Sequence, residues 1–251
     1  SVTQKINRLM STKEHYETHL ARYYSWMLGD FDSRMNETKA FFQTHNITPT
    51  STKVALDLGA GSGLQSLPLA QLGFEVTAID FSATLLKELR QRANGLAIET
   101  IESDLLHFEN YAHFAPELIV CMGDTLTHLD SIEVVRQLLQ QSAKQLVKNG
   151  KLILTFRDLS NELQNELRFI PVKSDENKIF TCFLEYHTDF VKVFDIVHEK
   201  ENGMWKQNIS FYNKLKLSRA LIEDLLQSIG LQIAFSDTTR GLVTIISTKE
   251  L

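Results

Sequence analysis

Three glycines at alternate positions follow a short apolar segment early in the chain. The run Asp57-Leu58-Gly59-Ala60-Gly61-Ser62-Gly63 joins a predicted strand over 54–58 to a predicted helix over 64–72. Glycine at these positions lets the backbone turn sharply and approach a ligand closely. Asp80 ends the next apolar segment, 21 residues after Gly59, where a carboxylate can accept hydrogen bonds from ribose hydroxyls. The G-x-G-x-G spacing disfavours a nucleotide-dependent oxidoreductase, and a glycine-rich turn without a ligand is the alternative.

The segments around this loop alternate between apolar strands and amphipathic helices. Further strands are expected at 74–79, 97–101, 118–122 and 152–156, and helices from Ser82 to about 93 and over 132–147. Short, fully apolar strands separated by helices indicate a parallel sheet covered on both faces. A helix from Ser218 to Gln227 and two strands, 231–235 and 242–247, end the chain. No crossover helix separates those two strands, so we expect an antiparallel hairpin.

Two other regions do not follow this alternation. Residues from about 11 to 45 are predicted helical, and 47–52 form a linker rich in turn residues. Strands at 180–186, 190–199 and 205–212 follow one another without helices, with the hairpin signal Asn202-Gly203 between the last two. We therefore predict four parts: an N-terminal helical lid segment (1–52), a ligand-binding core (53–165), an antiparallel β insertion covering the substrate site (166–214), and a helix and hairpin completing the core sheet (215–251).

Composition narrows the partners and the location. The net charge of −5 argues against nucleic acid and anionic membranes, which both favour a basic protein face. Cys121 and Cys182 are too few for a disulfide framework or a cysteine-rich zinc site, and His187 and His198 lack a third close ligand, so no metal site is expected. Without a signal peptide or an apolar run of ~18 residues, we expect a cytoplasmic monomer or homodimer.

These motifs together resemble the class I S-adenosylmethionine (SAM)-dependent methyltransferase family over about 53–160 and the last two strands. The resemblance rests on 56–63, Asp80, Asp104 before Leu105, and 117–122. It implies a Rossmann-like three-layer α/β sandwich with a seven-stranded, mostly parallel sheet whose last strand is antiparallel. It also implies SAM as cofactor and S-adenosylhomocysteine as product. The glycine loop would hold the methionine part of SAM, Asp80 the ribose and Asp104 the adenine amine.

A narrower resemblance is to the glycine N-methyltransferase group. It rests on Gly29-Asp30, Ser33-Arg34, Lys39-Ala40, Gly123, Thr125, His128-Leu129 and Arg157. The resemblance implies that Arg34 pairs with the SAM carboxylate, a bidentate role that a guanidinium suits. It implies further that His128 contacts the cofactor from the substrate side and that Arg157 binds a substrate carboxylate. The complete predicted cofactor set is Tyr24 (or Trp26, if the register slips), Arg34, Asp57, Gly59, Ala60, Gly61, Asp80, Phe81, Asp104, Leu105, Met122 and His128.

The chain departs from that group at Asp124, where the glycine enzymes carry an asparagine. A carboxylate there would repel an anionic substrate group and attract an ammonium or hydroxyl, which disfavours glycine as substrate. Asp124 and His128 both follow the fourth strand, so they are the candidate general bases. The alternatives are that Asp124 caps the turn with Thr125 and that His128 only orients the cofactor. With Arg157, these two residues form the predicted catalytic set.

The sequence thus predicts a methyltransferase acting on a small molecule, with an amine acceptor favoured over a hydroxyl or carboxylate. RNA or protein methylation is the alternative on the same fold. The acidic balance disfavours RNA, as does Cys121-Met122-Gly123-Asp124, which lacks the Asn-Pro-Pro-aromatic run of base-amine methyltransferases. A SAM-binding protein without catalysis is a further alternative.

Overall fold

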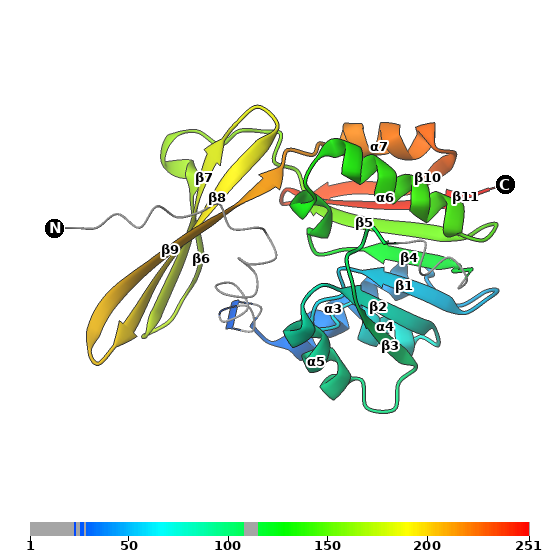
Figure 1. Cartoon of the computed structure of the whole chain (residues 1–251), viewed down its shortest axis with the longest axis horizontal. Helices are drawn as coiled ribbons and strands as arrows, with labels where there is room; N and C mark the ends of the chain where they lie inside the picture. The colour runs from blue at the N-terminus through cyan, green and yellow to red at the C-terminus, as the bar shows by residue number, and fades with distance from the viewer. Residues whose placement is uncertain (1–22, 24–25, 28, 108–114, 251) are drawn as a thin grey trace. The chain divides into compact units, whose positions relative to one another are not determined.

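The computed structural model describes residues 23, 26–27, 29–107 and 115–250. The chain divides into two compact units. Figure 1 shows the chain coloured by residue number from blue to red. The core unit comprises Asp30–Asn161 and Leu215–Leu251, and the insertion unit comprises Ser1–Gly29 and Glu162–Lys214. Each unit is described by itself.

The core unit is built on one seven-stranded sheet. Its strands are β1 (Val54–Leu58), β2 (Glu75–Asp80), β3 (Ile98–Glu102), β4 (Leu118–Cys121), β5 (Lys151–Arg157), β10 (Leu231–Thr239) and β11 (Leu242–Lys249). Their order is β10-β11-β5-β4-β1-β2-β3. The strands β1 to β5 pair in parallel, whereas β11 is antiparallel to both β5 and β10. The predicted fold class, including the antiparallel last strand, is confirmed.

Helices cover both faces of this sheet. On one face α3 (Phe31–Thr44), α4 (Ser66–Gln71) and α5 (Ala83–Arg92) pack against the sheet, and on the other α6 (Ile132–Gln145) and α7 (Arg219–Ser228) do so. Side chains alternate between the two cores along each strand, as expected for a sheet buried on both sides. In β1, for example, Ala55 enters the α3–α4 side and Leu56 the α6–α7 side.

Local capping explains where these helices begin. The side chains of Ser82, Ser131 and Ser218 accept hydrogen bonds from the backbone N–H groups of Leu85, Val134 and Leu221. Each serine satisfies a donor that the first helical turn leaves unpaired. The predicted caps at Ser82 and Ser218 are therefore confirmed. The structure corrects the start of α4, which begins at Ser66 rather than at residue 64, because the glycine loop continues two residues further.

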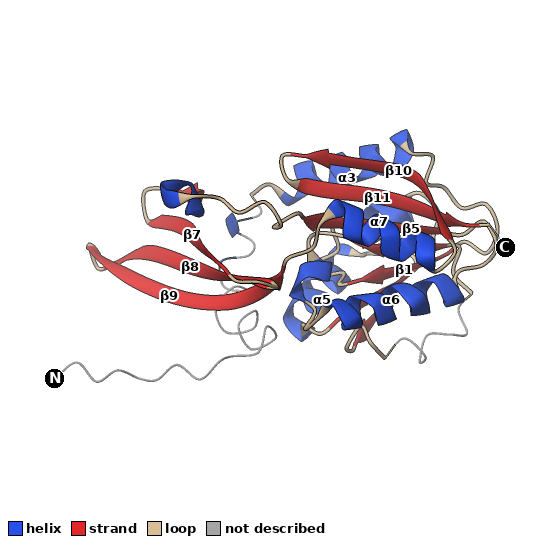
Figure 2. Cartoon of the chain, turned by 90° about the horizontal axis from the view of Figure 1, so that it is seen from above, coloured by secondary structure: helices blue, strands red, loops and turns tan. Residues whose placement is uncertain are grey.

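The insertion unit contains a four-stranded antiparallel sheet (Figure 2). Its strands, in order, are β6 (Phe169–Ser174), β7 (Lys178–Tyr186), β8 (Phe190–Glu201) and β9 (Met204–Leu215), preceded by the short 3-10 helix η4 (Asn165–Arg168). The three predicted strands are confirmed. Asn202 and Gly203 both have positive φ, 51° and 79°, as a two-residue hairpin turn requires. The sequence analysis missed β6, because Pro171 lies inside a mostly exposed strand without clear alternation.

Part of the N-terminal prediction can be compared with the structure. The helix α3 lies within the predicted helical region, whereas residues 1–22 lie outside the described part of the chain. Although α3 falls within the segment predicted as a lid, it belongs to the core unit and packs on α4. The four predicted part boundaries stay predictions. Among the described helices, none is long and apolar enough to cross a membrane.

Candidate functional site

The glycine loop is fastened to the carboxyl end of β2. The N–H groups of Gly59 and Ala60 donate to the Ile79 carbonyl at 2.9 and 3.1 Å, and Gly61 N–H donates to Asp80 Oδ2 at 2.8 Å. Gly59 and Gly61 have φ of 78° and 52°, in the left-handed region that favours glycine. Three hydrogen bonds therefore hold the backbone of the loop to the end of β2.

Steric contacts also require glycine in this loop. A Cβ atom on Gly59 would lie 2.4 Å from Thr125 Oγ1, and one on Gly63 would lie 2.4 Å from Leu89 Cδ1. Thr125 begins η3 (Thr125–His128), the short 3-10 helix that follows β4, and Leu89 belongs to α5. The loop therefore packs against α5 and against η3. The segment η3 ends at His128, one of the predicted catalytic residues.

Asp80 is buried and holds this arrangement together. Its Oδ1 accepts a second backbone hydrogen bond, from Ser82 N–H at 2.8 Å. Burial raises the pKa of Asp80, and the hydrogen bonds from Ser82 and Gly61 oppose the rise. The carboxylate thus joins the end of β2 to the glycine loop, and its predicted contact with a ribose stays a prediction.

Asp57, near the end of β1, is fully buried. Its Oδ2 accepts a hydrogen bond from Ser66 Oγ at 2.5 Å, whereas Oδ1 has no partner in the described part of the chain. Burial raises the pKa of Asp57 to about 7, the Ser66 bond opposes the rise and the Asp80 charge adds to it. Asp57 is thus a carboxyl group whose charge the fold supports poorly.

The other predicted cofactor residues follow the neighbouring strands. Asp104, after β3, is exposed and accepts from Leu106 N–H at 2.9 Å, and Leu105 is buried in the core. Phe81 and Met122 are half-buried directly after β2 and β4. The carboxyl ends of β1, β2, β3 and β4 therefore each carry an aspartate, namely Asp57, Asp80, Asp104 and Asp124. Four carboxyl groups therefore lie along this edge of the sheet.

The loop after β4 is held by β5. Gly123 N–H donates to Thr155 Oγ1 at 2.8 Å, and Arg157 N–H donates to Asp124 Oδ1 at 2.8 Å. Asp124 has φ of 78°, an uncommon conformation for a residue with a side chain. The predicted cap with Thr125 is wrong: Asp124 makes no side-chain cap bond, and the Thr125 hydroxyl donates to the Met122 carbonyl.

Thr155 was missed by the sequence analysis. It is a buried threonine between the apolar residues Leu154 and Phe156, two residues before Arg157. A buried hydroxyl needs a hydrogen-bond partner, so this polar residue near a strand end was the signal that could have identified it. Asp124 could not be linked to β5 from the sequence, because its partner is a backbone N–H group 33 residues away.

Arg157 and His128 complete the predicted acceptor-side group. The guanidinium of Arg157 is exposed and donates to the Arg240 carbonyl, in the turn between β10 and β11, at 3.3 Å. His128 is the half-buried last residue of η3. The structure joins Asp124 to Arg157 through the Arg157 backbone. The predicted roles of Asp124, His128 and Arg157 in catalysis stay predictions.

The first turn of α3 packs beside the glycine loop. Phe31 and Met35 pack against the cluster that contains Ala60. Arg34 is exposed on this turn, and its predicted contact with a SAM carboxylate stays a prediction. Tyr24 lies outside the described residues, and Trp26, its alternative, belongs to the insertion unit.

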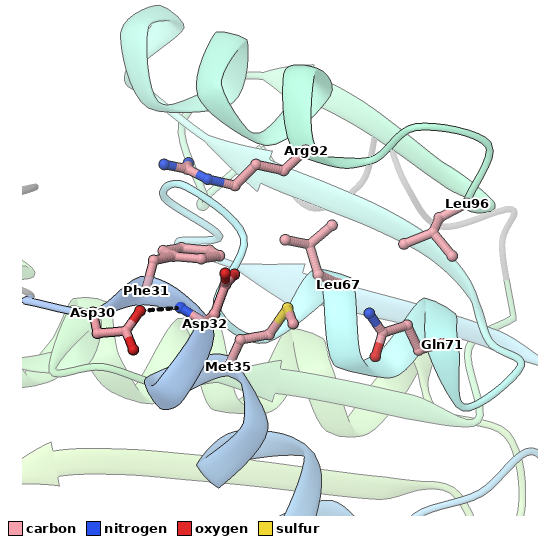
Figure 3. A pocket seen from close by; sticks show the side chains of 8 residues that line it. All are labelled: Asp30, Phe31, Asp32, Met35, Leu67, Gln71, Arg92 and Leu96. Atoms are coloured by element: carbon pink, nitrogen blue, oxygen red, sulfur yellow. Dashed lines mark hydrogen bonds between the residues drawn. The ribbon is translucent and has the colours of Figure 1, made fainter.

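A pocket of about 430 Å³ lies between α3, α4 and α5 (Figure 3). It is lined by Asp30, Phe31, Asp32, Met35, Leu67, Gln71, Arg92 and Leu96. Arg92 lies 4.2 Å from the centre of the Phe31 ring and donates to the Ser62 carbonyl in the glycine loop at 3.4 Å. Among the lining residues there is no member of the predicted cofactor or acceptor-side sets. Arg92 thus connects the pocket to the glycine loop, and none of the four strand-end aspartates is among its lining residues.

The chain is similar to known methyltransferases in sequence and fold. Residues 55–150 match the family model of a methyltransferase domain. A Geobacillus sp. (strain WCH70) protein classed as a methyltransferase is 30% identical over 167 residues, 62% of this chain and 67% of that protein. The glycine/sarcosine N-methyltransferase of Halorhodospira halochloris is 29% identical over 138 residues, 54% of this chain and 51% of that protein.

Structural similarity extends further along the chain. The crystal structure of a SAM-dependent methyltransferase from Clostridium acetobutylicum superposes with a TM-score of 0.71 at 16% identity, covering 94% of this chain and 99% of the other. In sequence, the chain spans about half the length of the curated glycine/sarcosine N-methyltransferases that it matches. The structural match therefore shows the fold alone, whereas the sequence matches show the family.

Proposed function

The chain belongs to the methyltransferase family, as its motifs had indicated, and from that premise we propose that it transfers the methyl group of SAM to a small-molecule amine. The observation that carries this proposal is the glycine loop, fixed to Asp80 at the carboxyl edge of the core sheet. In open α/β sheets, ligands bind at the carboxyl ends of the strands.

The charge of this edge fits the proposed cofactor. SAM carries a sulfonium, an ammonium and a carboxylate group, so its net charge is positive, and four strand ends carry the carboxyl groups of Asp57, Asp80, Asp104 and Asp124. Opposite charges at close range attract strongly where water is excluded. The bent glycine backbone, without side chains, also leaves room for a ligand beside β1. Both features support SAM and do not depend on any relative.

When bound, SAM supplies a methyl group already activated by its sulfonium, so the protein mainly binds, orients and excludes water. In the proposal the glycine loop, Asp80 and Asp104 bind the methionine, ribose and adenine parts of the cofactor. Arg34 pairs with its carboxylate. Asp124, His128 and Arg157 bind and orient the acceptor from the ends of β4 and β5.

An amine acceptor is supported by two observations. The curated relatives that match include glycine/sarcosine N-methyltransferases. In this chain Asp124 Oδ1 accepts a backbone hydrogen bond, which leaves the negative charge of the carboxylate in place to attract an ammonium group. A carboxylate at this position disfavours glycine itself, so the proposed acceptor is an amine without an adjacent carboxylate.

The first experiment is calorimetry of the purified chain with SAM and S-adenosylhomocysteine, followed by turnover on a panel of amines, alcohols and bulk RNA. We expect micromolar binding and S-adenosylhomocysteine release with a subset of amines. Absence of binding would refute the proposed function. Transfer to RNA or to alcohols alone would refute the amine acceptor but leave the cofactor assignment standing.

The variant Asp124→Asn tests the acceptor assignment separately. The side-chain carbonyl of the introduced asparagine can still accept the Arg157 N–H bond, so only the charge is removed. We expect SAM affinity to change by less than about twofold and the KM for cationic amines to rise about tenfold, since one charge pair is lost. Asp124→Ala is the matched control that also removes the loop contact. A large loss of SAM binding in Asp124→Asn would contradict this role.

A further inference from the structure

The turn between β10 and β11 is fastened to the carboxyl end of β5. Arg240 and Gly241 are the two residues of this turn. Arg157 Nη1 donates to the Arg240 carbonyl at 3.3 Å, and Asp158 N–H donates to the Gly241 carbonyl at 3.0 Å. The turn therefore lies at the edge of the core sheet where the ligands are proposed to bind.

Arg240 is an unusual residue for this turn. Both turn residues have positive φ, 50° for Arg240 and 77° for Gly241, as in a type I′ turn. Asparagine, aspartate and glycine are preferred at the first position, because other side chains are strained at positive φ. The turn Asn202-Gly203 of the insertion unit follows this preference. A strained residue where a better one is available points to a role for its side chain.

Among the described residues, no carboxylate forms an ion pair with Arg157 or Arg240. Both arginines are exposed. The carboxylate of Asp158, which directly follows Arg157, accepts its hydrogen bonds from Ser160 and from Arg219 N–H instead. The fold therefore brings two arginines together at one edge of the sheet. A guanidinium presents its donors in a planar fork that suits a carboxylate or a phosphate.

The strand order separates this turn from Asp124. The strand β5 lies between β4 and β11 (Figure 1), and Arg157 bonds to Asp124 through its backbone and to the turn through its side chain. Neighbouring strands are about 4.8 Å apart, so Asp124 and the turn are two strand spacings, or roughly 10 Å, apart. In an α-amino acid the nitrogen and the carboxyl carbon are only roughly 2.5 Å apart. The spacing fits a longer molecule.

We propose that Arg240 is a specificity-determining residue, which binds with Arg157 an anionic group, carboxylate or phosphate, at the far end of the acceptor. The inference rests on the proposed methyl transfer to an amine and defines that amine further. The acceptor nitrogen lies at Asp124, and its anionic group lies at the β10–β11 turn, several bonds away. The strained conformation of Arg240 holds a positive charge at that position.

Turnover on matched pairs of amines tests this substrate class. One pair is γ-aminobutyrate with the corresponding amino alcohol, and the other is aminopropyl phosphate with aminopropanol. We expect the anionic member of at least one pair to have a kcat/KM about tenfold above that of its alcohol, as one charge-assisted contact predicts. The two pairs distinguish a carboxylate from a phosphate. Equal values within both pairs would overturn the proposal.

The variant Arg240→Asn removes the charge and relieves the turn. Because asparagine tolerates positive φ, the Tm should stay the same or rise, whereas the preference for the anionic amine should fall about tenfold. Lys148→Asn is the matched control, since Lys148 is an exposed cation in the turn before β5, at the opposite edge of the sheet. It should keep the preference. An unchanged preference in Arg240→Asn would overturn the proposal, whatever its Tm.

An NMR titration with inorganic phosphate tests the anion site without methyl transfer. Read at the backbone amide of Gly241, phosphate should bind the wild-type chain about fivefold more tightly than Arg240→Asn. This difference in a chain that does not bind SAM would support the anion site and reject the proposed function. Equal binding by the two chains would overturn the anion site, even where methyl transfer to an amine is observed.

Discussion

Buried carboxyl groups lie at both edges of the core sheet, and their surroundings differ. At the amino-terminal edge, Glu117 directly precedes β4 and accepts hydrogen bonds from both the backbone and the hydroxyl of Thr50 and Ser51, and from Lys53 N–H, at 2.7–3.2 Å. Burial acts to raise the pKa of Glu117, but these hydrogen bonds outweigh it and the pKa is lowered.

At the carboxyl edge the balance is reversed. Burial raises the pKa of Asp57 to about 7, and one of its oxygens has no described partner. At the amino-terminal edge, the Glu117 carboxylate therefore holds the preceding linker to the sheet. At the carboxyl edge, where a ligand is proposed to bind, the ionised form of Asp57 is poorly stabilised. The well-satisfied carboxylate and the candidate site therefore lie at opposite edges of the same sheet.

The largest effect is expected at the amino-terminal edge. Glu117→Ala removes the acceptor for five donor groups and should lower the free energy of unfolding by roughly 3 to 4 kcal/mol. Because the folded-state pKa is lowered, the contribution of Glu117 is present above the ordinary glutamate pKa and is lost as the pH falls below it. Urea unfolding at pH 7 and pH 3 would measure this. Glu117→Gln, which keeps one acceptor oxygen, should lose less, and equal losses would contradict the assignment.

A second effect is expected in ligand binding alone. If Arg34 pairs with the SAM carboxylate, Arg34→Ala should weaken SAM binding by between about 1.5 and 3 kcal/mol. Because Arg34 is exposed, its loss should leave the unfolding free energy unchanged. Calorimetric titration with SAM would measure the affinity, with Lys39→Ala on the same helix as control. Unchanged affinity in Arg34→Ala would refute its role.

The third effect tests whether the fold disfavours the ionised form of Asp57. The folded-state pKa of Asp57 lies above its unfolded value of 3.8, so its contribution to stability is fully present below about pH 4 and is lost as the pH rises to about 7. Asp57→Asn cannot ionise and keeps an acceptor for Ser66. It should be more stable than the wild type at pH 8 by about 2 kcal/mol and show a flatter pH profile. A destabilised variant at pH 8 would mean that the charge is supported after all.

The smallest effect concerns the loop after β4. Thr155→Val leaves the Gly123 N–H without its acceptor and should cost about 1 kcal/mol in unfolding free energy. Thr155→Ser, which keeps the hydroxyl, is the matched control and should retain most of that bond. If the loop positions the acceptor, Thr155→Val should also change the KM for the acceptor more than the affinity for SAM. If Thr155→Ser lost as much stability and changed the KM as much as Thr155→Val, the hydroxyl would not be the cause of these effects.

The features that the sequence predicted correctly share a local origin. The glycine loop, the serine caps of α5 and α7 and the Asn202-Gly203 turn each depend on residues within a few positions of one another. Apolar periodicity then identified the strands of the core sheet, because burial on both faces leaves few other patterns possible. The strand β6 was missed because an exposed edge strand does not have to follow that pattern.

The amino-acid sequence by itself determined the fold class, the family and the loop proposed to bind the cofactor, since these follow from backbone conformation and local burial. Only the tertiary structure decided which carboxyl groups are satisfied. The donors of Glu117 lie 64 to 67 residues away, and the partner of Asp124 lies 33 residues away. Hydrogen bonds between strand ends depend on how the sheet is assembled, and no local pattern encodes them.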